Sequence, residues 1–353
     1  MSAAPRKWIG ALAALAAAGL LLMGLQQRPA PTTAYGFSGP TMGTSYHVTL
    51  ATDPGEALRT RLAVDIEATL ARINGRMSTY DPESELSRFN AHTGTDWYPV
   101  SEETLEVVRT AQEISALTGG AFDVTVGPLV DLWGFGPAMP AELPPSNQRI
   151  SDLLARVGYG LLDLREDPPA LRKRKPELHV DLSAIAKGYA VDEVAALLAA
   201  AGIEDFLVEI GGEIQASGTN KAGLPWRIAI EKPASGQRTA QRIIGIHDLG
   251  LATSGDYRNF FEVSGQRYSH TIDPRTGHPV RHQVASVSVL DPSAMRADAL
   301  ATALLAMGAD GFAFAERHAI AALVIERDAD GGFQERPTSA FRGYTQAQEQ
   351  TGP

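Results

Sequence analysis

The sequence predicts a mixed α+β fold in which largely antiparallel sheets carry packed helices. Three observations support this class. Strand-like segments outnumber helical ones, short turns separate several of them, and apolar residues alternate strictly along Val284–Leu290. Antiparallel strands can be joined by short turns, whereas a doubly wound parallel sheet needs a helical crossover at each step. The 353 residues, of which 44% are hydrophobic and 20% charged, suffice for one large or two ordinary domains with a real core.

The N-terminus has the charge pattern of an export signal. Arg6 and Lys7 precede a continuous apolar run, Trp8–Leu25, which approaches the roughly 17–20 residues needed to span a bilayer. We expect residues 1–28 to be either a cleaved signal peptide or an uncleaved membrane anchor. A Pro-rich linker over residues 29–34 follows. No cysteine follows the run, so lipid attachment of the bacterial lipoprotein kind is excluded.

The folded part is expected to span residues 35–345, with a polar tail over 346–353. Gly39–Thr44 predicts a turn that leads into a strand, Tyr46–Leu50. A helix over Glu56–Asn74 follows, with apolar residues at helical spacing. A second helix, Glu102–Thr118, begins after Ser101 as N-cap and ends before a glycine.

The second half alternates between strands and helices. The expected strands are Leu178–Leu182, Phe206–Ile210, Trp226–Ile230, Ile243–His247, Phe260–Val263, Val284–Leu290 and Ala319–Ile325, and the expected helices are Tyr189–Ala201 and Met295–Met307.

Composition excludes several classes of function. The formal net charge of −10 argues against sequence-independent nucleic-acid binding, which needs a basic surface. The absence of cysteine excludes disulfides, thiolate zinc sites, iron–sulfur clusters and cysteine nucleophiles. Any metal must therefore be held by oxygen or imidazole ligands, which points to Mg²⁺ or Ca²⁺ more than to zinc.

Tyr268–Val280, which reads YSHTIDPRTGHPV, concentrates titratable residues at a predicted strand end. The strand carries His270 and breaks at the Pro-Arg-Thr-Gly turn that begins after Asp273. Polar groups held by a stiff turn suit a binding or catalytic site, and the alternative is a hydrogen-bonded surface hairpin.

Asp298 and Thr302 lie four residues apart in an Ala-rich helical segment, so they share one buried face. A carboxylate and a hydroxyl there would supply two oxygen ligands to a hard cation. The alternative is that Asp298 caps the first turn of the helix and Thr302 bonds back to a carbonyl.

Three further segments allow two interpretations each. Asp181–Tyr189 places Lys187 where a helix opens, which suits a phosphate but equally an ordinary connection; it is not a Walker A loop. Gly211-Gly212 permits close ligand approach or a tight hairpin turn. Thr253 and Ser254, in a predicted polar turn, either present hydroxyls to a phosphate or close a hairpin.

Two aromatic residues have weaker signals. Tyr80 precedes a turn, where its ring could stack on a planar ligand. Phe122 and Asp123 follow a helix stop. For both segments the alternative is ordinary core or surface packing.

Taken together, the motifs resemble the ApbE-type family of flavin transferases (FAD:protein FMN transferases). The resemblance covers nearly the whole chain beyond the linker. The matching segments, in order, are GPTMGTSYHV from Gly39, MSTYDPESELSRFN from Met77, GAFDVTVGPLVDLWGFG from Gly120, DLSAIAKGYAVD from Asp181, EIGGEI from Glu209, ATSGDYRNFF from Ala252, YSHTIDPRTGHPV from Tyr268 and ADALATALLAMG from Ala297.

The resemblance implies a T-fold-like duplication and a reaction. Members of this family split FAD, attach FMN through a phosphoester to a threonine of an acceptor protein and release AMP, with Mg²⁺ as cofactor. Acceptors are typically subunits of membrane redox pumps. The implied location is the periplasmic face of a bacterial inner membrane. Many relatives carry a lipoprotein cysteine, which this chain lacks.

The resemblance also implies site residues. The metal would be held by the side chains of Asp298 and Thr302 and the backbone carbonyl of Ala184. The implied FAD contacts are Met42, Tyr80, Ala121, Phe122, Asp123, Asp181, Lys187 and Ile272. His270 would lie beside the diphosphate; we hypothesise that it takes the proton of the acceptor threonine, with Asp181 as the other candidate base.

The same residues are also compatible with two other functions. An FAD pyrophosphatase would use the same site with water in place of threonine. A non-catalytic, flavin-binding exported protein would need no pair of metal ligands.

Overall fold

A computed structural model describes residues 34–136, 144–234, 239–257, 259–263 and 266–350, and it has the predicted α+β class. Its centre is an eight-stranded sheet in which all neighbouring strands are antiparallel. In spatial order the strands are β1 (Tyr35–Thr41), β2 (Thr44–Leu50), β6 (Phe206–Ile210), β7 (Glu213–Ser217), β10 (Leu249–Gly255), β15 (Val284–Asp291), β16 (Ala321–Arg327) and β17 (Phe333–Pro337).

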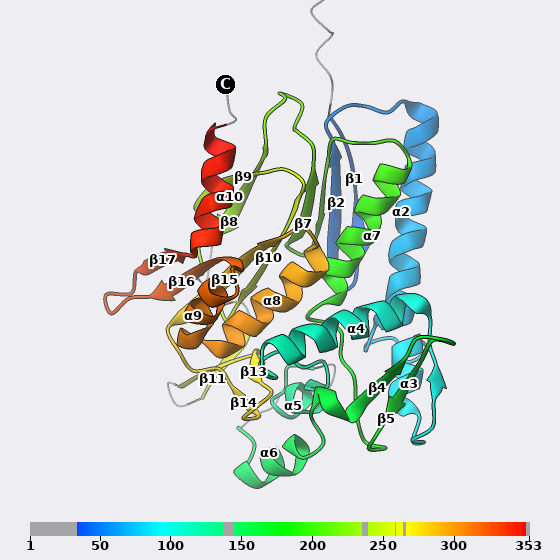
Figure 1. The fold of residues 1–353 in the computed structure, drawn as a ribbon, viewed down its shortest axis with the longest axis vertical. Helices are drawn as coiled ribbons and strands as arrows, with labels where there is room; N and C mark the ends of the chain where they lie inside the picture. Colours follow the sequence, from blue (N-terminus) through cyan, green and yellow to red (C-terminus); the bar gives the residue numbers. More distant parts are fainter. Residues whose placement is uncertain (1–33, 137–143, 235–238, 258, 264–265, 351–353) are drawn as a thin grey trace, which may run out of the picture.

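Both faces of this sheet are covered, which explains why Ala321 to Ile325 are buried without alternation. Helices α2 (Glu56–Met77), α7 (Ala186–Ala200) and α8 (Ala294–Met307) cover one face, and α4 (Glu102–Leu117) crosses beside them (Figure 1). The hairpin of β8 (Trp226–Glu231) and β9 (Ala240–Ile246) and the helix α10 (Ser339–Gln350) cover the other. Neighbouring strand residues such as Leu251 and Ala252 therefore enter different cores.

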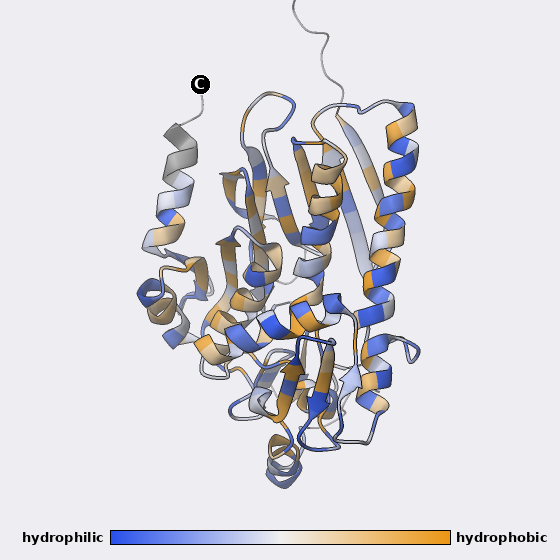
Figure 2. Ribbon diagram, turned by 45° about the vertical axis from the view of Figure 1, so that its right-hand side comes forward, coloured by the Kyte–Doolittle hydropathy of each residue, from blue (hydrophilic) through white to orange (hydrophobic). Residues whose placement is uncertain are grey.

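Hydropathy follows this layering. Figure 2 shows hydrophobic residues along the central strands, whereas α2 alternates between hydrophobic and hydrophilic residues as expected for a helix with one solvent-facing side.

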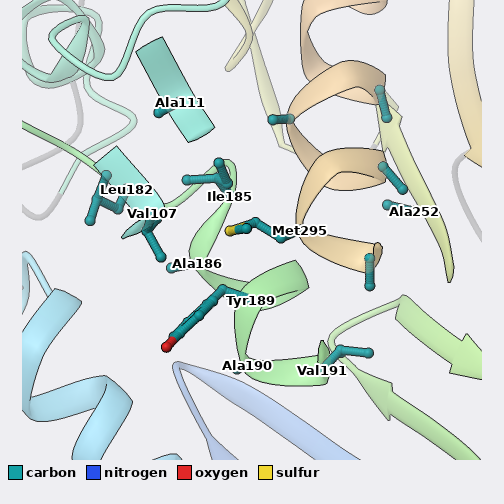
Figure 3. Close-up of a cluster of buried hydrophobic side chains, with 14 of the residues drawn as sticks. Val107, Ala111, Leu182, Ile185, Ala186, Tyr189, Ala190, Val191, Ala252 and Met295 are labelled. Carbon is teal, nitrogen blue, oxygen red and sulfur yellow. The ribbon is translucent and has the colours of Figure 1, made fainter. Parts of the chain in front are cut away.

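Helices α4, α7 and α8 meet in a seam of small and apolar side chains (Figure 3). Met295 of α8 reaches toward Ile185 and Ala186 at the start of α7. A Cβ atom added to Gly188 would come within 2.6 Å of the Cα of Met295, and closer still to the carbonyl oxygen of Ala294. Glycine at this position lets the two helices approach closely.

A second group of elements lies beside the main sheet (Figure 1). It contains the short helices α3 (Glu85–Ala91), α5 (Gly127–Leu132) and α6 (Asn147–Leu154), the 3₁₀ turn η1 (Tyr159–Leu161), and the small sheet of β3 (Tyr98–Pro99), β5 (Ala170–Lys173) and β4 (Leu162–Arg165). Helix α9 (Ala309–Arg317) instead packs on α8 and β16 of the main body. Two hairpins, β11 (Phe260–Val263) with β12 (Gln266–Ser269) and β13 (Ile272–Asp273) with β14 (His278–Pro279), form separate sheets within the described part of the chain.

The predicted strand Leu178–Leu182 is wrong. Its backbone groups are bound by other partners: Val180 exchanges two 2.8 Å hydrogen bonds with the side chain of Asn90, and the Asp181 N–H donates to the carbonyl of Val124 at 2.7 Å. With these groups occupied, the segment pairs with no strand among the described residues.

Other boundaries also differ. Strand β1 continues to Thr41, so the predicted turn shrinks to Met42 and Gly43, both with positive φ. Thr253 and Ser254 lie inside β10, paired with β15, rather than in a turn. Helix α7 begins at Ala186, which places Lys187 in its first turn.

The predicted signal or anchor and most of the linker lie outside the described residues. Among the described ones, no helix is long and apolar enough to cross a membrane. Helix α10 extends through Gln350, so residues 346–350 of the predicted tail are helical.

Candidate active site

A buried ion cluster joins α7, α8 and β7. The ammonium of Lys187 lies 2.9 Å from Oε1 of Glu213 and 3.8 Å from Oδ2 of Asp298. Burial raises the pKa of both carboxyl groups against the pull of the lysine, to about 7 for Glu213. Burial opposes the charge of Lys187, but the two carboxylates outweigh it and raise its pKa. The lysine is therefore a permanent positive charge at physiological pH.

The main chain holds this cluster in place. The N–H of Gly188 donates to Oδ2 of Asp298 at 3.2 Å. The carboxylate of Asp192, also on α7, accepts from the Ser293 hydroxyl and from the N–H groups of Ala294 and Met295. Because these N–H groups open α8, Asp192 aligns the start of α8 with α7.

The capping alternative for Asp298 is wrong. Ser293 caps α8, and its hydroxyl accepts from the N–H of Arg296. Asp298 lies further along the helix and is buried. The hydroxyl of Thr302 pairs with that of Ser254 on β10 at 2.9 Å rather than with a carbonyl of its own helix. Asp298 and Thr302 thus share the face of α8 that packs on β10.

The oxygen groups here fit a hard cation. Oε2 of Glu213 is buried without a hydrogen-bond partner among the described residues. Ala184 lies in the turn just before α7. In the described residues no group of three or more His, Cys, Asp or Glu could hold a metal by itself. Mg²⁺ is commonly bound by one or two carboxylates together with substrate phosphates, so Asp298 and Thr302 suit an ion shared with a diphosphate.

Two turns converge on Lys187. Gly211 and Gly212 connect β6 to β7 with φ of 64° and 110°, so the hairpin interpretation is confirmed. A Cβ at Gly211 would meet Cγ2 of Thr44 at 2.9 Å and Cδ of Lys187 at 3.3 Å. The turn that carries Met42 therefore lies near the lysine, at the same end of the sheet.

His270 follows β12 and is oriented by Asn259. The carbonyl of Asn259 lies 3.1 Å from Nδ1 of His270 and also accepts from its backbone N–H at 3.0 Å. Because a carbonyl only accepts, Nδ1 carries the proton and Nε2 presents a lone pair. Burial is the main effect that lowers the pKa of His270, and the charge of Lys187 lowers it further. The hydrogen bond to Asn259 and the charge of Asp256 act in the opposite direction but do not outweigh burial. The imidazole is neutral at pH 7, as a general base requires.

Asp181 and Tyr80 belong to a second polar group. Oδ1 of Asp181 accepts from the N–H and the hydroxyl of Ser183 at 2.9 and 2.5 Å. Tyr80 is 69% exposed. Partial burial of its hydroxyl and the charges of Asp181 and Asp131 raise its pKa. No sequence pattern singled out Asp131, which lies within the GAFDVTVGPLVDLWGFG segment that begins at Gly120.

The remaining predicted FAD contacts are buried. Ala121, Phe122 and Asp123 are at most 6% exposed. Oδ1 of Asp123 accepts from the N–H and hydroxyl of Thr125, and Oδ2 accepts from the N–H of Tyr159. Burial and these hydrogen bonds keep the side chains inside the protein. Any contact that residues 121–123 make with FAD would therefore come from the main chain.

Ile272 of β13 is 5% exposed and packs in a cluster with Leu129, Trp133 and Tyr268. The following turn is confirmed: the carbonyl of Asp273 accepts from the N–H of Gly277 at 2.8 Å.

Fold and site together define a class: an α+β protein with a lysine–carboxylate cluster, a pair of hard oxygen ligands and a neutral histidine. Residues 42–324 match the model of the ApbE family. A protein named FAD:protein FMN transferase from Vibrio cholerae is 48% identical over 96% of this chain and 99% of its own length. One of the same name from Haemophilus influenzae is 43% identical over 90% and 93%.

Solved structures agree. The flavin transferase ApbE from Vibrio cholerae superposes with a TM-score of 0.82 at 47% identity, covering 89% of this chain and 100% of that one. The apo flavinyl transferase ApbE from Pseudomonas stutzeri superposes with a TM-score of 0.82 at 40% identity, covering 90% and 99%. The chain belongs to the ApbE family.

Proposed function

We propose that this protein transfers FMN from FAD to a threonine side chain of an acceptor protein and releases AMP. The observation that carries the proposal is the placement of a permanently charged lysine beside Asp298, on the face of α8 that also carries Thr302. The names of the relatives support the same reaction.

The reaction breaks the phosphoanhydride bond of FAD and forms a phosphoester bond to threonine in its place. The threonine oxygen bonds to the phosphorus of the FMN half, the bridging P–O bond breaks, and the electron pair leaves on the phosphate of AMP. His270 accepts the threonine proton at Nε2. Lys187 is positioned to neutralise charge that develops on the diphosphate oxygens, and phosphoryl transfer depends mainly on such positioning and neutralisation.

Asp298, Thr302 and the carbonyl of Ala184 are the residues that would hold Mg²⁺. When bound, the ion would supply further positive charge at the diphosphate. The side chains of Asp298 and Thr302 are fixed for this role by Gly188 and Ser254.

The exposed ring of Tyr80 is proposed to stack on the flavin, with Met42, the Ala121–Asp123 loop, Asp181 and Ile272 as further contacts.

Water in place of threonine would make the protein an FAD pyrophosphatase through the same site. A protein that only binds flavin would have no use for a neutral histidine whose Nδ1 is bound so that Nε2 carries the lone pair.

One incubation separates these activities. The protein is mixed with FAD, Mg²⁺ and a candidate acceptor, and the products are a flavin-fluorescent acceptor band and free AMP. We expect both. AMP and FMN without a band would indicate hydrolysis, and neither product would indicate binding alone. His270→Gln should lower the transfer rate about 10²–10⁴-fold, while the exposed Glu113→Gln variant serves as control. A wild-type rate for His270→Gln would contradict the assignment of the base.

We further propose that the protein is exported and acts at the periplasmic face of a bacterial inner membrane, on subunits of membrane redox pumps. The apolar run Trp8–Leu25 after Arg6 and Lys7 supports export. The test is protease digestion of intact spheroplasts of the native organism: degradation of the protein is expected, and protection until lysis would contradict export.

A further inference from the structure

In the described residues, the hairpin before His270 forms no strand pairing with the main sheet. Strands β11 and β12 pair only with each other in the described residues, through four residue pairs from Phe260↔Ser269 to Val263↔Gln266. An isolated two-stranded hairpin is at best marginally stable in water. Contacts made by side chains must therefore place the hairpin, and with it the imidazole.

Aromatic rings provide such contacts. Trp133 stacks on Tyr268 with centroids 5.6 Å apart, Tyr268 on Phe261 at 5.0 Å, and Phe261 on Phe135 at 5.4 Å. We call these four residues the aromatic column. Tyr268 and Phe261 come from the hairpin, whereas Trp133 and Phe135 follow α5.

The outer end of the column reaches the imidazole. The ring of Phe135 meets that of His270 edge to face, with centroids 6.3 Å apart and planes at 70°. At the inner end, the indole N–H of Trp133 donates to the carbonyl of Gly277 at 2.9 Å. The column thus runs from Gly277, in the turn after β13, to the proposed base.

We propose that Phe135 is a positioning residue for catalysis, which holds the imidazole of His270 in the plane that directs Nε2 at the acceptor hydroxyl. The carbonyl of Asn259 fixes one atom of the ring, Nδ1, but leaves the ring free to tilt about that hydrogen bond. An edge-to-face contact from a second direction removes this freedom. The proposal rests on the role of His270 in the proposed function.

The ring of Phe135 also adds to the burial of the imidazole that it meets. The charged groups that act on His270 are Asp256, which favours its protonated form, and Lys187, which opposes it; burial is the larger effect and keeps the ring neutral. Removing the phenyl ring would hydrate the imidazole, so its pKa should rise toward the ordinary value.

The test compares Phe135→Leu with Phe135→Tyr, which restores the ring, and with Phe312→Leu, which removes a half-buried phenyl ring of α9 outside the site. For Phe135→Leu we expect kcat to fall about tenfold with an unchanged KM for FAD, since a misplaced base slows chemistry without loosening substrate. The acid limb of its pH–rate profile should move to higher pH. Phe135→Tyr and Phe312→Leu should follow the wild type.

The imidazole is followed directly by NMR titration of histidine ring protons, with His270→Gln identifying the signal. A higher pKa of His270 in Phe135→Leu supports the proposal. A wild-type kcat and titration in Phe135→Leu, while His270→Gln is slow, would overturn it and leave the proposed function intact. A wild-type rate for His270→Gln would overturn the role of His270 itself.

Discussion

Two regions supply the charged and the titrating parts of the site, and they are built differently. Lys187, Glu213 and Asp298 are placed by the main chain, through the close contact of α7 with α8 and the ladder that holds β7. His270 is held by the carbonyl of Asn259 and, beyond it, by side chains: the aromatic column and the Arg327–Asp256 ion pair, which contacts the hairpin through Arg267. Damage to the first region should therefore reduce stability and activity together, whereas damage to the second should reduce activity more selectively.

The largest effect is expected from Gly188→Ala. The new Cβ would collide with backbone atoms of Ala294 and Met295, which cannot move aside as a side chain can. We expect a loss of about 4 kcal/mol in the free energy of unfolding, measured by urea denaturation, and loss of FMN transfer. The control is Gly75→Ala on the exposed side of α2, where a Cβ meets nothing and the helix should gain about 0.5–1 kcal/mol. Equal stability of the two variants would contradict a main-chain origin for the cluster.

Arg327→Met tests the support of the hairpin. Both Nη atoms of Arg327 donate to the buried carboxylate of Asp256. The backbone carbonyl of Asp256 accepts a hydrogen bond from the side chain of Arg267 on β12. Removing Arg327 leaves that carboxylate without its ion-pair partner, so we expect the free energy of unfolding to fall by about 3 kcal/mol. We also expect kcat to change by a larger factor than KM for FAD. Arg336→Met, which breaks the more exposed pair with Glu326, should cost about 1 kcal/mol or less. If Arg327→Met raised KM alone, the hairpin would not owe its placement to this pair.

Glu213 should make stability depend on pH. Its folded pKa, about 7, exceeds the value of 4.5 expected for the unfolded chain. The folded state therefore binds the proton more tightly, and the stability this contributes is full below pH 4.5 and lost as pH rises to about 7. Urea denaturation at pH values across this range should show the free energy of unfolding declining by about 1–3 kcal/mol as the pH rises. The decline should disappear in Glu213→Gln. An identical pH slope in both proteins would mean that Glu213 does not titrate there.

The smallest effect on stability is expected for Tyr80→Ala. The ring is 69% exposed, so its removal should change the free energy of unfolding by less than about 0.5 kcal/mol. A lost stacking contact of about 0.5–1.5 kcal/mol should weaken FAD binding about 2–13-fold, as measured by calorimetry. Unchanged affinity would remove Tyr80 from the proposed flavin site.

Periodicity predicted most elements because each carries its own pattern of burial. Helix α2 and strand β15 lie within a few residues of their predicted bounds. The apolar spacing of α2 reports its buried face, whereas β15 is buried on both faces and is marked by its alternating side-chain types. Leu178–Leu182 had the composition of a strand but forms none. Its hydrogen bonds go to Asn90 and Val124, distant residues that no local pattern indicates.

The fold class, the family and the residue types of the site can be predicted from the sequence, because they depend on local spacing and on motifs in a given order. How those residues combine is visible only in the folded molecule. Folding brought Glu213 to Lys187, placed Ser254 against Thr302, and set Phe135 against His270. The physical reason is that a site built across two helices, a sheet and a hairpin depends on how closely their backbones pack. The sequence shows that residue 188 is glycine, but only the folded structure shows that α8 packs against it.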